Sequence, residues 1–238
     1  MKHARLRRDL IETARKMNAL GVNQGSSGNL SARIRMGLLI TPSGVAYEAL
    51  QPADIVEMAG DGRWACARPG RTPSSEWRFH RDILEARPEF GAVLHCHSLN
   101  ATALSCLRRE IPAFHYMVAV TGGESVRCAP YATFGSEALS RYALKALEGR
   151  KACLLANHGM IAAGEDLAGA LALAVEVETL AAQYCQALQV GAPKILSKAE
   201  MRRVLAKFEV GYGAASAPGA APAAKDRARA RKRPGKGR

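Results

Sequence analysis

Short strand-like segments alternate with helix-like segments along residues 1–213, and this pattern restricts the fold more than any other feature of the chain. Apolar residues recur at three- and four-residue spacing between Leu6 and Leu20, which predicts an amphipathic helix ending near Gly21. Four short segments predict two hairpins, residues 29–34 with 37–40 and residues 55–58 with 64–67. Frequent hairpins without a regular strand–helix–strand repeat favour a mainly antiparallel sheet flanked by helices, in an α/β or α+β layered domain.

The same alternation continues along the rest of the chain. We expect helices over residues 75–86, 100–108, 136–148 and 167–187, and strands over residues 92–96 and 152–156. No internal repeat is visible, and no uninterrupted apolar stretch approaches the ~18 residues of a membrane span. The length of 238 residues suits one domain, which we place at residues 1–213.

The net charge of +13 is concentrated at the two ends of the chain. Residues 214–238 carry eight Lys or Arg against one Asp and residues 1–16 carry six against two, whereas residues 17–213 are nearly neutral. The segment 214–238 is rich in Ala, Pro and Gly and lacks large apolar side chains, which predicts a disordered basic tail. Such a tail suits either a nonspecific contact with nucleic acid or a solubilising role without a partner, and we favour the second.

The six cysteines are scattered and form no C-x-x-C pair. The first 16 residues are charged and helix-like, without the apolar core of a secretory signal. These features predict reduced thiols rather than a disulfide framework, and a cytoplasmic location.

Two histidines separated by one residue, His95 and His97, give the strongest local signal for chemistry. Side chains two apart on a strand point to the same side, so both rings would face one pocket and Cys96 would face away. His158 lies where an apolar strand runs into a glycine-containing turn, a common place for functional groups. Three imidazoles leave one position open for a substrate oxygen, which is typical of catalytic zinc, although histidines with only a structural role would give the same spacing.

The three other histidines have weaker signals. His3 lies in a basic helical segment and His80 on the helix predicted over residues 75–86, where ordinary surface or packing roles are expected. His115 is left without a role.

Three loops rich in glycine and hydroxyl groups, residues 25–31, 41–44 and 72–76, precede the histidines. Glycine lets backbone N–H groups approach an anion, and hydroxyls add donors, so together the loops predict an anion pocket. Each loop alone could be an ordinary turn. None matches the Walker loop or the dinucleotide fingerprint, so no nucleotide cofactor is indicated.

Glu76 is the acidic residue best placed for chemistry, because it lies in the first helical turn beside the third hydroxyl loop. Its carboxylate could instead serve only to interact with the helix dipole. Near a metal-bound ketone, the same carboxylate could remove the proton on the adjacent carbon, while the metal stabilises the enediolate as a Lewis acid.

Taken in order, several short motifs resemble one known family. The motifs are Gly28-Asn29, Thr41-Pro-Ser43-Gly44, Ser74-Ser75-Glu76, His95-x-His97, Asn157-His158-Gly159, His115-Tyr116-Met117 and Ala129-Pro-Tyr131-Ala-Thr-Phe134-Gly. The chain resembles the class II aldolase/adducin-head family over about residues 4–213, and within it the fuculose phosphate aldolase subgroup. The resemblance implies a three-layer α-β-α fold with a largely antiparallel sheet, and a C4 homotetramer with active sites at subunit interfaces.

The resemblance also implies a set of site residues. His95, His97 and His158 would hold zinc or another divalent metal, and Glu76 would bind that metal at rest and then shuttle the substrate proton. The phosphate of dihydroxyacetone phosphate would be bound by six residues: Gly28, Asn29, Ser43, Gly44, Ser74 and Ser75. Tyr116 of a neighbouring subunit would protonate the aldehyde oxygen during condensation, and Phe134 would line the aldehyde pocket. Tyr212 resembles another family tyrosine, but its alignment does not assign it a role.

The predicted activity is cleavage of L-fuculose 1-phosphate, or a related ketose 1-phosphate, to dihydroxyacetone phosphate and L-lactaldehyde or another short aldehyde. A sugar-phosphate 4-epimerase and a methylthioribulose-phosphate dehydratase of the same fold are alternatives. The epimerases use a further acidic residue in the middle loop; residues 116–121 contain none, and Glu124 keeps that alternative open. A non-catalytic, adducin-like binding module is a further alternative, against which the three histidines and Glu76 argue.

Overall fold

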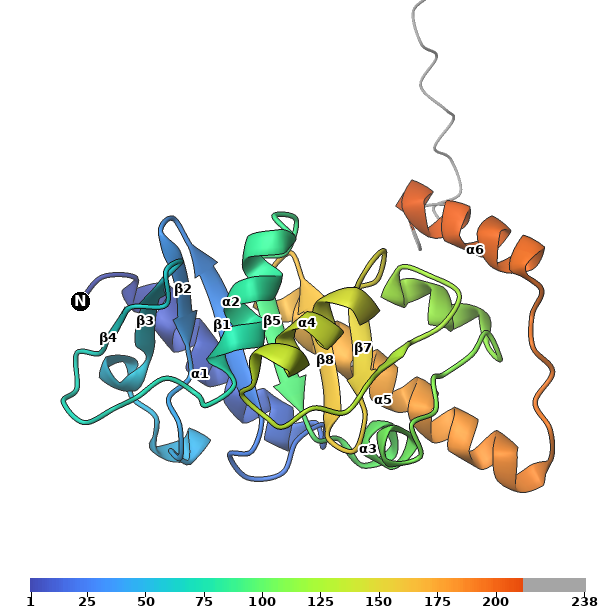
Figure 1. The fold of residues 1–238 in the computed structure, drawn as a ribbon, viewed down its shortest axis with the longest axis horizontal. Helices are drawn as coiled ribbons and strands as arrows, with labels where there is room; N and C mark the ends of the chain where they lie inside the picture. Colours follow the sequence, from blue (N-terminus) through green and yellow to red (C-terminus); the bar gives the residue numbers. More distant parts are fainter. Residues whose placement is uncertain (212–238) are drawn as a thin grey trace, which may run out of the picture.

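The structure, a computed structural model, describes residues 1–211. Within that range the strands are β1 (Asn29–Ile34), β2 (Gly37–Ile40), β3 (Val56–Ala59), β4 (Trp64–Ala65), β5 (Ala92–Cys96), β6 (Cys128–Ala129), β7 (Ala152–Leu155) and β8 (Gly159–Gly164). They form one sheet in the order β4-β3-β2-β1-β5-β8-β7-β6 (Figure 1). All neighbouring strands are antiparallel except β6 and β7, which confirms the largely antiparallel sheet.

Helices surround this sheet. The α-helices are α1 (Ala4–Ala19), α2 (Trp77–Ala86), α3 (Leu99–Cys106), α4 (Glu137–Ala146), α5 (Leu167–Val190) and α6 (Lys198–Gly211). Three short 3₁₀ helices complete the described part: η1 (Tyr47–Ala49), η2 (Pro52–Asp54) and η3 (Tyr116–Thr121). Tyr212 and the predicted tail at residues 214–238 lie outside the described residues.

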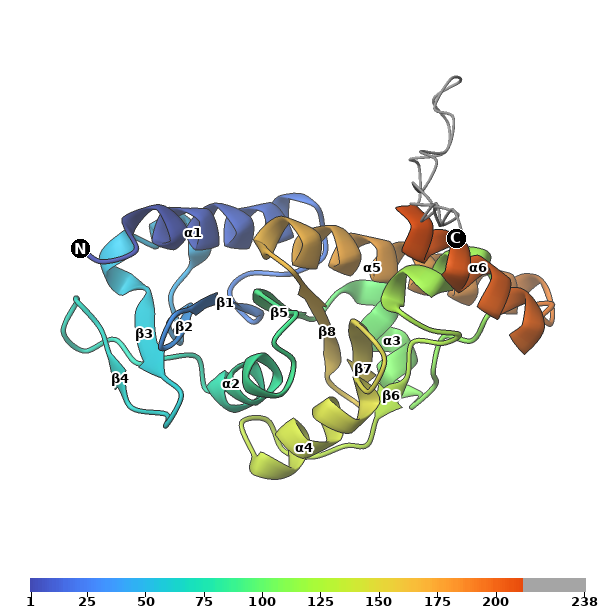
Figure 2. The ribbon, with the colours of Figure 1, turned by 90° about the horizontal axis from the view of Figure 1, so that it is seen from above.

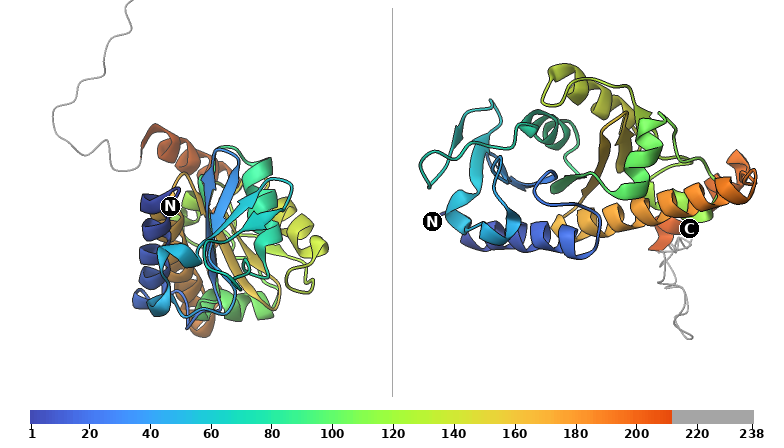
Figure 3. Two further views of the ribbon diagram at one scale, coloured as in Figure 1. Left: turned by 90° about the vertical axis from the view of Figure 1, so that its left-hand side faces the viewer. Right: turned by 90° about the horizontal axis from the view of Figure 1, so that it is seen from below.

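The sheet lies between two layers of helix. Seen from above, α1 and α5 run along one side of the strands and α2 and α4 along the other (Figure 2). The end-on view shows the strands between these layers (Figure 3). The chain is therefore a three-layer α/β protein, as predicted.

Alternation along the strands explains the two layers, because successive side chains of a strand point to opposite faces of the sheet. On β5, Leu94 and Cys96 belong to the apolar core shared with α1 and α5, whereas Val93 belongs to the core shared with α2 and α4. His95 has the same parity as Val93, and its ring lies 5.5 Å from the ring of Phe79 on α2, edge to face. The prediction that Cys96 faces away from His95 is confirmed.

Most predicted elements occur within one or two residues of their predicted bounds, and three were missed. Strands β6 and β8 and helix α6 had not been predicted. The sequence of β8, Gly-Met-Ile-Ala-Ala-Gly, is short and made mostly of small residues, and Ile161 is its one β-branched or aromatic side chain, so the strand signal is weak. It is nevertheless buried between β5 and β7. Helix α2 begins at Trp77 rather than residue 75, because Ser74 and Glu76 form a turn before it.

None of the helices within residues 1–211 is both long enough and apolar enough to cross a membrane. All six cysteines have free thiols; Cys96 and Cys153 are buried, and Cys106 is exposed. Burial raises the pKa of the Cys96 thiol to about 12, so this thiol stays protonated and unreactive.

Candidate active site

Three histidines converge at one end of the central strands. His95 lies near the end of β5, His97 directly follows that strand, and His158 occupies the turn between β7 and β8. One ring nitrogen of each lies within 4.8 Å of the other two, and the Nε2 atoms of His95 and His97 are 3.0 Å apart. These three residues could hold a metal ion, as their spacing predicted.

Each ring turns a nitrogen toward the centre of the cluster. The Nδ1 atom of His95 lies 2.9 Å from the carbonyl oxygen of Met160, which can only accept, so Nδ1 carries a proton and Nε2 faces the other rings. Burial, with the nearby His95 ring, lowers the pKa of His97 and of His158 to about 4. Neutral imidazole is the form that binds metal ions.

The carboxylate of Glu76 faces the same cluster. Its Oε2 lies 3.1 Å from Nε2 of His95, and its Oε1 lies 3.2 Å from Nε2 of His158. Burial alone raises the pKa of Glu76, but the neighbouring His95 and His158 rings and the Asn29 amide outweigh it and hold that pKa below its usual value. Glu76 is therefore ionised at neutral pH.

The donor set fits a divalent cation. The buried Oε1 atom of Glu76 has no hydrogen-bond partner in the described part of the chain, which is an unusual state for a buried carboxylate oxygen. A cation among the rings would satisfy this oxygen. Three imidazole nitrogens and one carboxylate are donors that zinc takes in proteins.

The three predicted anion loops lie together beside Glu76. The backbone N–H of Leu30 donates to Oγ1 of Thr41 at 3.2 Å, which joins the first loop to the second. Backbone bonds from Ser43 to Thr72 and from Ser74 to Thr41, both 3.0 Å, join the second loop to the third. Tertiary structure thus gathers hydroxyl and N–H groups that are far apart in sequence.

Glycine at position 28 is required by its neighbours, and glycine at position 44 is favoured by its backbone conformation. A Cβ on Gly28 would lie 2.6 Å from the carbonyl oxygen of His95 and 2.6 Å from Oδ1 of Asn23, so no larger residue fits. The hydroxyl of buried Tyr47 donates to the carbonyl of Gly28 at 2.5 Å and fixes this loop. Gly44 has a φ of 68°, which favours glycine.

A cavity of about 340 Å³ opens above the histidines and Glu76. Its lining residues are Ser27, Ser75, Glu76, His97, Tyr131, Ala132, Phe134, Asn157 and His158. Phe134 thus lies where the resemblance implied. Ser43, Gly44 and Ser74 do not line this cavity. The Asn29 side chain donates to Oε2 of Glu76 at 3.0 Å.

Tyr116 is not brought to this cavity within one chain. It lies on η3, and with His115 it lines a separate cavity of about 600 Å³ against α6. His115 accepts a hydrogen bond from the backbone N–H of Met117 at 3.3 Å. Any role of Tyr116 at a cluster of this kind therefore requires a second copy of the chain.

Four residues at or behind the site had not been predicted individually as site residues. Ser27, Tyr131 and Asn157 line the cavity, and His80 is fully buried behind it. Asn157 has a φ of 54°, and the Asn-His-Gly sequence that permits this turn was the available signal. No local signal placed Tyr131 in the cavity, because an irregular loop has no periodicity from which the direction of a side chain can be predicted.

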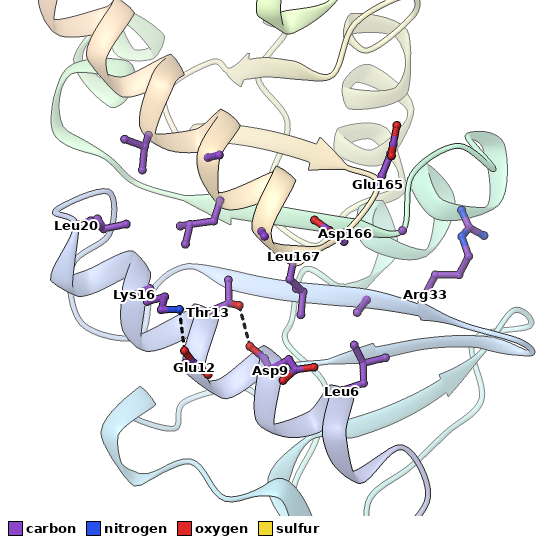
Figure 4. A pocket seen from close by; sticks show the side chains of 16 residues that line it. Leu6, Asp9, Glu12, Thr13, Lys16, Leu20, Arg33, Glu165, Asp166 and Leu167 are labelled. Atoms are coloured by element: carbon purple, nitrogen blue, oxygen red, sulfur yellow. Dashed lines mark hydrogen bonds and ion pairs between the residues drawn. The ribbon is translucent and has the colours of Figure 1, made fainter. Parts of the chain in front are cut away.

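A larger cavity lies far from this chemistry. It has about 910 Å³ and lies between α1 and the start of α5, with apolar side chains such as Leu6, Leu20 and Leu167 along it (Figure 4). Acidic and basic residues occur at its edge, but none of the three clustered histidines lines it. The smaller cavity, with its buried charge and metal-ligating groups, is therefore the candidate active site.

Comparison with known proteins agrees with this geometry. Residues 8–185 match the family described as Class II Aldolase and Adducin N-terminal domain. The chain belongs to this class II aldolase family. The match contains β1, β2, α2, β5 and the turn that carries His158, so every element that builds the site belongs to the family domain.

Relatives of this class II aldolase have names that refer to aldolases. A 5-methylthioribulose-1-phosphate/5-deoxyribulose-1-phosphate aldolase of Rhodospirillum rubrum is 57% identical over 208 residues, which are 87% of this chain and 92% of the relative. An L-fuculose phosphate aldolase of Escherichia coli K12 is 47% identical over 214 residues, 90% of this chain and 98% of the relative. A solved L-fuculose 1-phosphate aldolase structure superposes with a TM-score of 0.84 at 39% identity, covering 88% of this chain and 98% of that one.

Proposed function

We propose that the protein is a metal-dependent aldolase that cleaves a ketose 1-phosphate to dihydroxyacetone phosphate and a short aldehyde. The observation that carries this proposal is the ionised Glu76 carboxylate, which lies against His95 and His158 of the three-histidine cluster at the edge of an open cavity. Removing a proton from the carbon next to a carbonyl requires a base, and here the base lies beside a set of metal ligands. The hydroxyl loops at the same edge suit the phosphate.

In cleavage, the bond between C3 and C4 of the ketose breaks and its electron pair stays on C3. The C4 hydroxyl loses its proton and becomes the aldehyde, and C3 takes up a proton to give dihydroxyacetone phosphate. Glu76 delivers that proton to C3, and in the reverse direction its carboxylate removes it. Tyr116 of a neighbouring subunit exchanges the proton on the aldehyde oxygen.

His95, His97 and His158 would hold the metal, with Glu76 as a fourth ligand when no substrate is bound. A divalent cation bound there, which we propose to be zinc, supplies Lewis acidity at the substrate carbonyl. The chain's own groups bind and orient the rest. Ser75 and the backbone around Gly28 and Gly44 receive the phosphate.

The far wall of the cavity suggests the class of aldehyde. Tyr131, Ala132 and Phe134 present a largely apolar surface, and Phe134 is 64% exposed. An aldehyde that ends in a methyl or methylthio group would cover this surface without burying an unpaired polar group. The names of the relatives from Rhodospirillum rubrum and Escherichia coli agree with such substrates. We therefore propose 5-deoxy and 5-methylthio pentulose 1-phosphates, with L-fuculose 1-phosphate as the related hexulose.

A substrate panel tests this function. The purified protein is incubated with 5-methylthioribulose 1-phosphate, 5-deoxyribulose 1-phosphate, L-fuculose 1-phosphate and ribulose 5-phosphate, and dihydroxyacetone phosphate is detected directly. We expect its release from one or more of the 1-phosphates, its loss in EDTA and its return with Zn²⁺. Release that survives complete metal removal would contradict the proposal.

The other activities give different products in the same panel. Isomerised pentose without carbon–carbon cleavage would identify an epimerase, and loss of water from methylthioribulose 1-phosphate would identify a dehydratase. Absence of any bound divalent ion, together with no turnover, would favour an adducin-like binding module.

The proposal requires an oligomer, because Tyr116 lies outside the cavity of its own chain. We propose a homotetramer with active sites at the subunit interfaces. Light scattering on the eluting protein should give four times the 25.4 kDa chain mass. A monomeric mass with full activity would rule out the role of Tyr116.

A further inference from the structure

Three buried polar side chains, joined to one another by hydrogen bonds, lie directly behind Glu76. Ser31 on β1 and His80 on α2 are fully buried, and Asn29 at the start of β1 is 4% exposed. The Ser31 hydroxyl lies 2.8 Å from Nδ1 of His80. Nε2 of His80 lies 2.5 Å from Oδ1 of Asn29, whose Nδ2 donates to Glu76. Of the two roles predicted for His80, surface or packing, its burial confirms packing, and these hydrogen bonds add contacts that were not predicted.

The donors and acceptors of Ser31, His80 and Asn29 determine where the proton lies in each of these hydrogen bonds. Oδ1 of Asn29 can only accept, so Nε2 of His80 must carry the proton. Burial lowers the pKa of His80 to about 3, so its ring is neutral and Nδ1 has no proton. Nδ1 therefore accepts from the Ser31 hydroxyl.

The direction of these hydrogen bonds, from donor to acceptor, decides which end of the Asn29 amide faces Glu76. An asparagine amide has an accepting end and a donating end, and either could face the carboxylate. The donor on His80 binds the oxygen end, so the NH₂ end faces Oε2 of Glu76. In the opposite orientation, the amide oxygen would face a carboxylate oxygen, and the two would repel.

We propose that His80 is a positioning residue that holds the Asn29 amide in the orientation that donates to Glu76. This inference rests on the proposed function, in which the Glu76 carboxylate moves the substrate proton. His80 lies outside the cavity lining and acts only through Asn29. The Ser31 hydroxyl can donate to Nδ1, which is compatible with the tautomer that donates at Nε2.

Two variants of His80 separate this role from simple packing. His80→Gln places an N–H near the position of Nε2 and can still donate to Asn29, whereas His80→Asn is shorter and leaves Oδ1 of Asn29 without a donor. We expect kcat of H80N to fall about 10- to 100-fold with KM changed by less than about 3-fold, the range for second-layer partners of metal ligands. We expect H80Q to recover most of kcat.

A matched control removes a hydrogen bond that α4 makes to another residue of α2. The hydroxyl of Ser140 donates to Oδ2 of Asp82 at 2.6 Å, and Ser140 is 1% exposed. Ser140→Ala should lower the thermal unfolding midpoint without changing kcat of the folded protein. Equal kcat in H80N, H80Q and wild type would overturn the positioning role.

A second readout does not depend on turnover. In ¹H–¹⁵N spectra of the full-length, metal-free protein, His80 should be protonated at Nε2, and the Asn29 side-chain amide should show one strongly hydrogen-bonded proton. That amide signal should persist in H80Q and be lost in H80N. A His80 ring protonated at Nδ1, or an amide signal unchanged in H80N, would overturn the inference. If these signals behave as expected but wild type releases no dihydroxyacetone phosphate, the proposed function fails and the positioning of Glu76 stands.

Discussion

At the scale of single residues, the surroundings of Glu76 suit both of its proposed roles, metal ligand and base. The residue is 5% exposed, and burial alone would favour the neutral form of its carboxyl group. Two imidazoles and the Asn29 amide lower its pKa and keep it charged. Within residues 1–211 its Oε1 has no hydrogen-bond partner, so in the proposed function this oxygen is available to a metal or a substrate proton.

Replacement of Glu76 by Gln tests that charge. Glu76→Gln keeps the size of the side chain and removes the base, so we expect the release of dihydroxyacetone phosphate to slow by about 10²- to 10⁴-fold. Steady-state kinetics on the best substrate of the panel, with metal content measured in parallel, checks this. Glu85→Gln, the same change at an exposed position of α2, is the control and should keep full activity. Similar rates for both variants would remove Glu76 from the mechanism.

At the scale of elements, the junction of β5 and β8 sets the position of the histidines. Five residue pairs join the two strands, from Ala92 with Gly164 to Cys96 with Met160. His97 follows β5 at the point where β8 begins with Gly159. A Cβ on Gly159 would lie 2.5 Å from the carbonyl oxygen of Cys96 and 2.7 Å from Cδ2 of His97. Gly159 thus permits the close approach that keeps His97 in the cluster.

Gly159→Ala should therefore disturb both stability and metal binding. We expect a loss of about 1–3 kcal/mol in the free energy of unfolding, the usual effect of overpacking, and weaker Zn²⁺ binding because His97 is displaced. Urea unfolding and zinc titration of the purified variant measure the two effects. Gly60→Ala is the control, since a Cβ there meets nothing within 4 Å. Unchanged zinc affinity in G159A would show that His97 can move without harm to the site.

At the scale of the whole molecule, buried titratable groups connect the active site to the stability of the fold. Burial lowers the pKa of His80 to about 3, from 6.5 for an exposed histidine. Between these values the unfolded chain binds a proton that the folded chain does not. The contribution of His80 to stability is therefore fully present above about pH 6.5 and is lost as the pH falls toward 3. The lowered pKa of Glu76 acts in the same direction below pH 4.5.

The metal-free protein should consequently lose stability on acidification. His80 alone contributes a slope of at most about 1.4 kcal/mol per pH unit between pH 6 and 4. Urea unfolding in EDTA at pH 7, 6, 5 and 4 measures the free energy of unfolding of wild type and of H80Q, which lacks this titrating group. The slope of H80Q should be shallower. Parallel curves for the two proteins would show that His80 does not titrate as its burial requires.

The two ends of the chain carry most of the net charge, whereas the active site lies in the nearly neutral middle. Deletion of residues 214–238 should therefore leave the release of dihydroxyacetone phosphate unchanged and remove any salt-sensitive binding to nucleic acid. Turnover assays and binding titrations with a duplex at two salt concentrations check both expectations. Loss of turnover in the truncated protein would show that this segment contributes to the site.

Much of the site could be predicted because its signals are local. The spacing of His95 and His97 defines two side chains on one side of a strand, whatever the rest of the chain does. Glycine and hydroxyl residues mark loops in the same way. The hairpin of β1 and β2 follows from alternation over ten or so residues.

Other features depend on contacts between distant segments, and local patterns do not encode them. The small residues of β8 become a central strand only because β5 and β7 lie on either side of it. Tyr131 lines the cavity and Tyr116 does not, because of the course that the backbone takes between the strands.

The sequence by itself determined the layered class of the fold, the three histidines and the loops, because short-range periodicity and residue chemistry express these directly. Only the tertiary structure decided that Glu76 faces the histidines, with one oxygen that has no hydrogen-bond partner within residues 1–211, and that His80 orients Asn29 from behind. Those relations join α2 to β1, β5 and the turn before β8. Their geometry is set by the packing of a whole helix layer on the sheet, which no short stretch of sequence specifies.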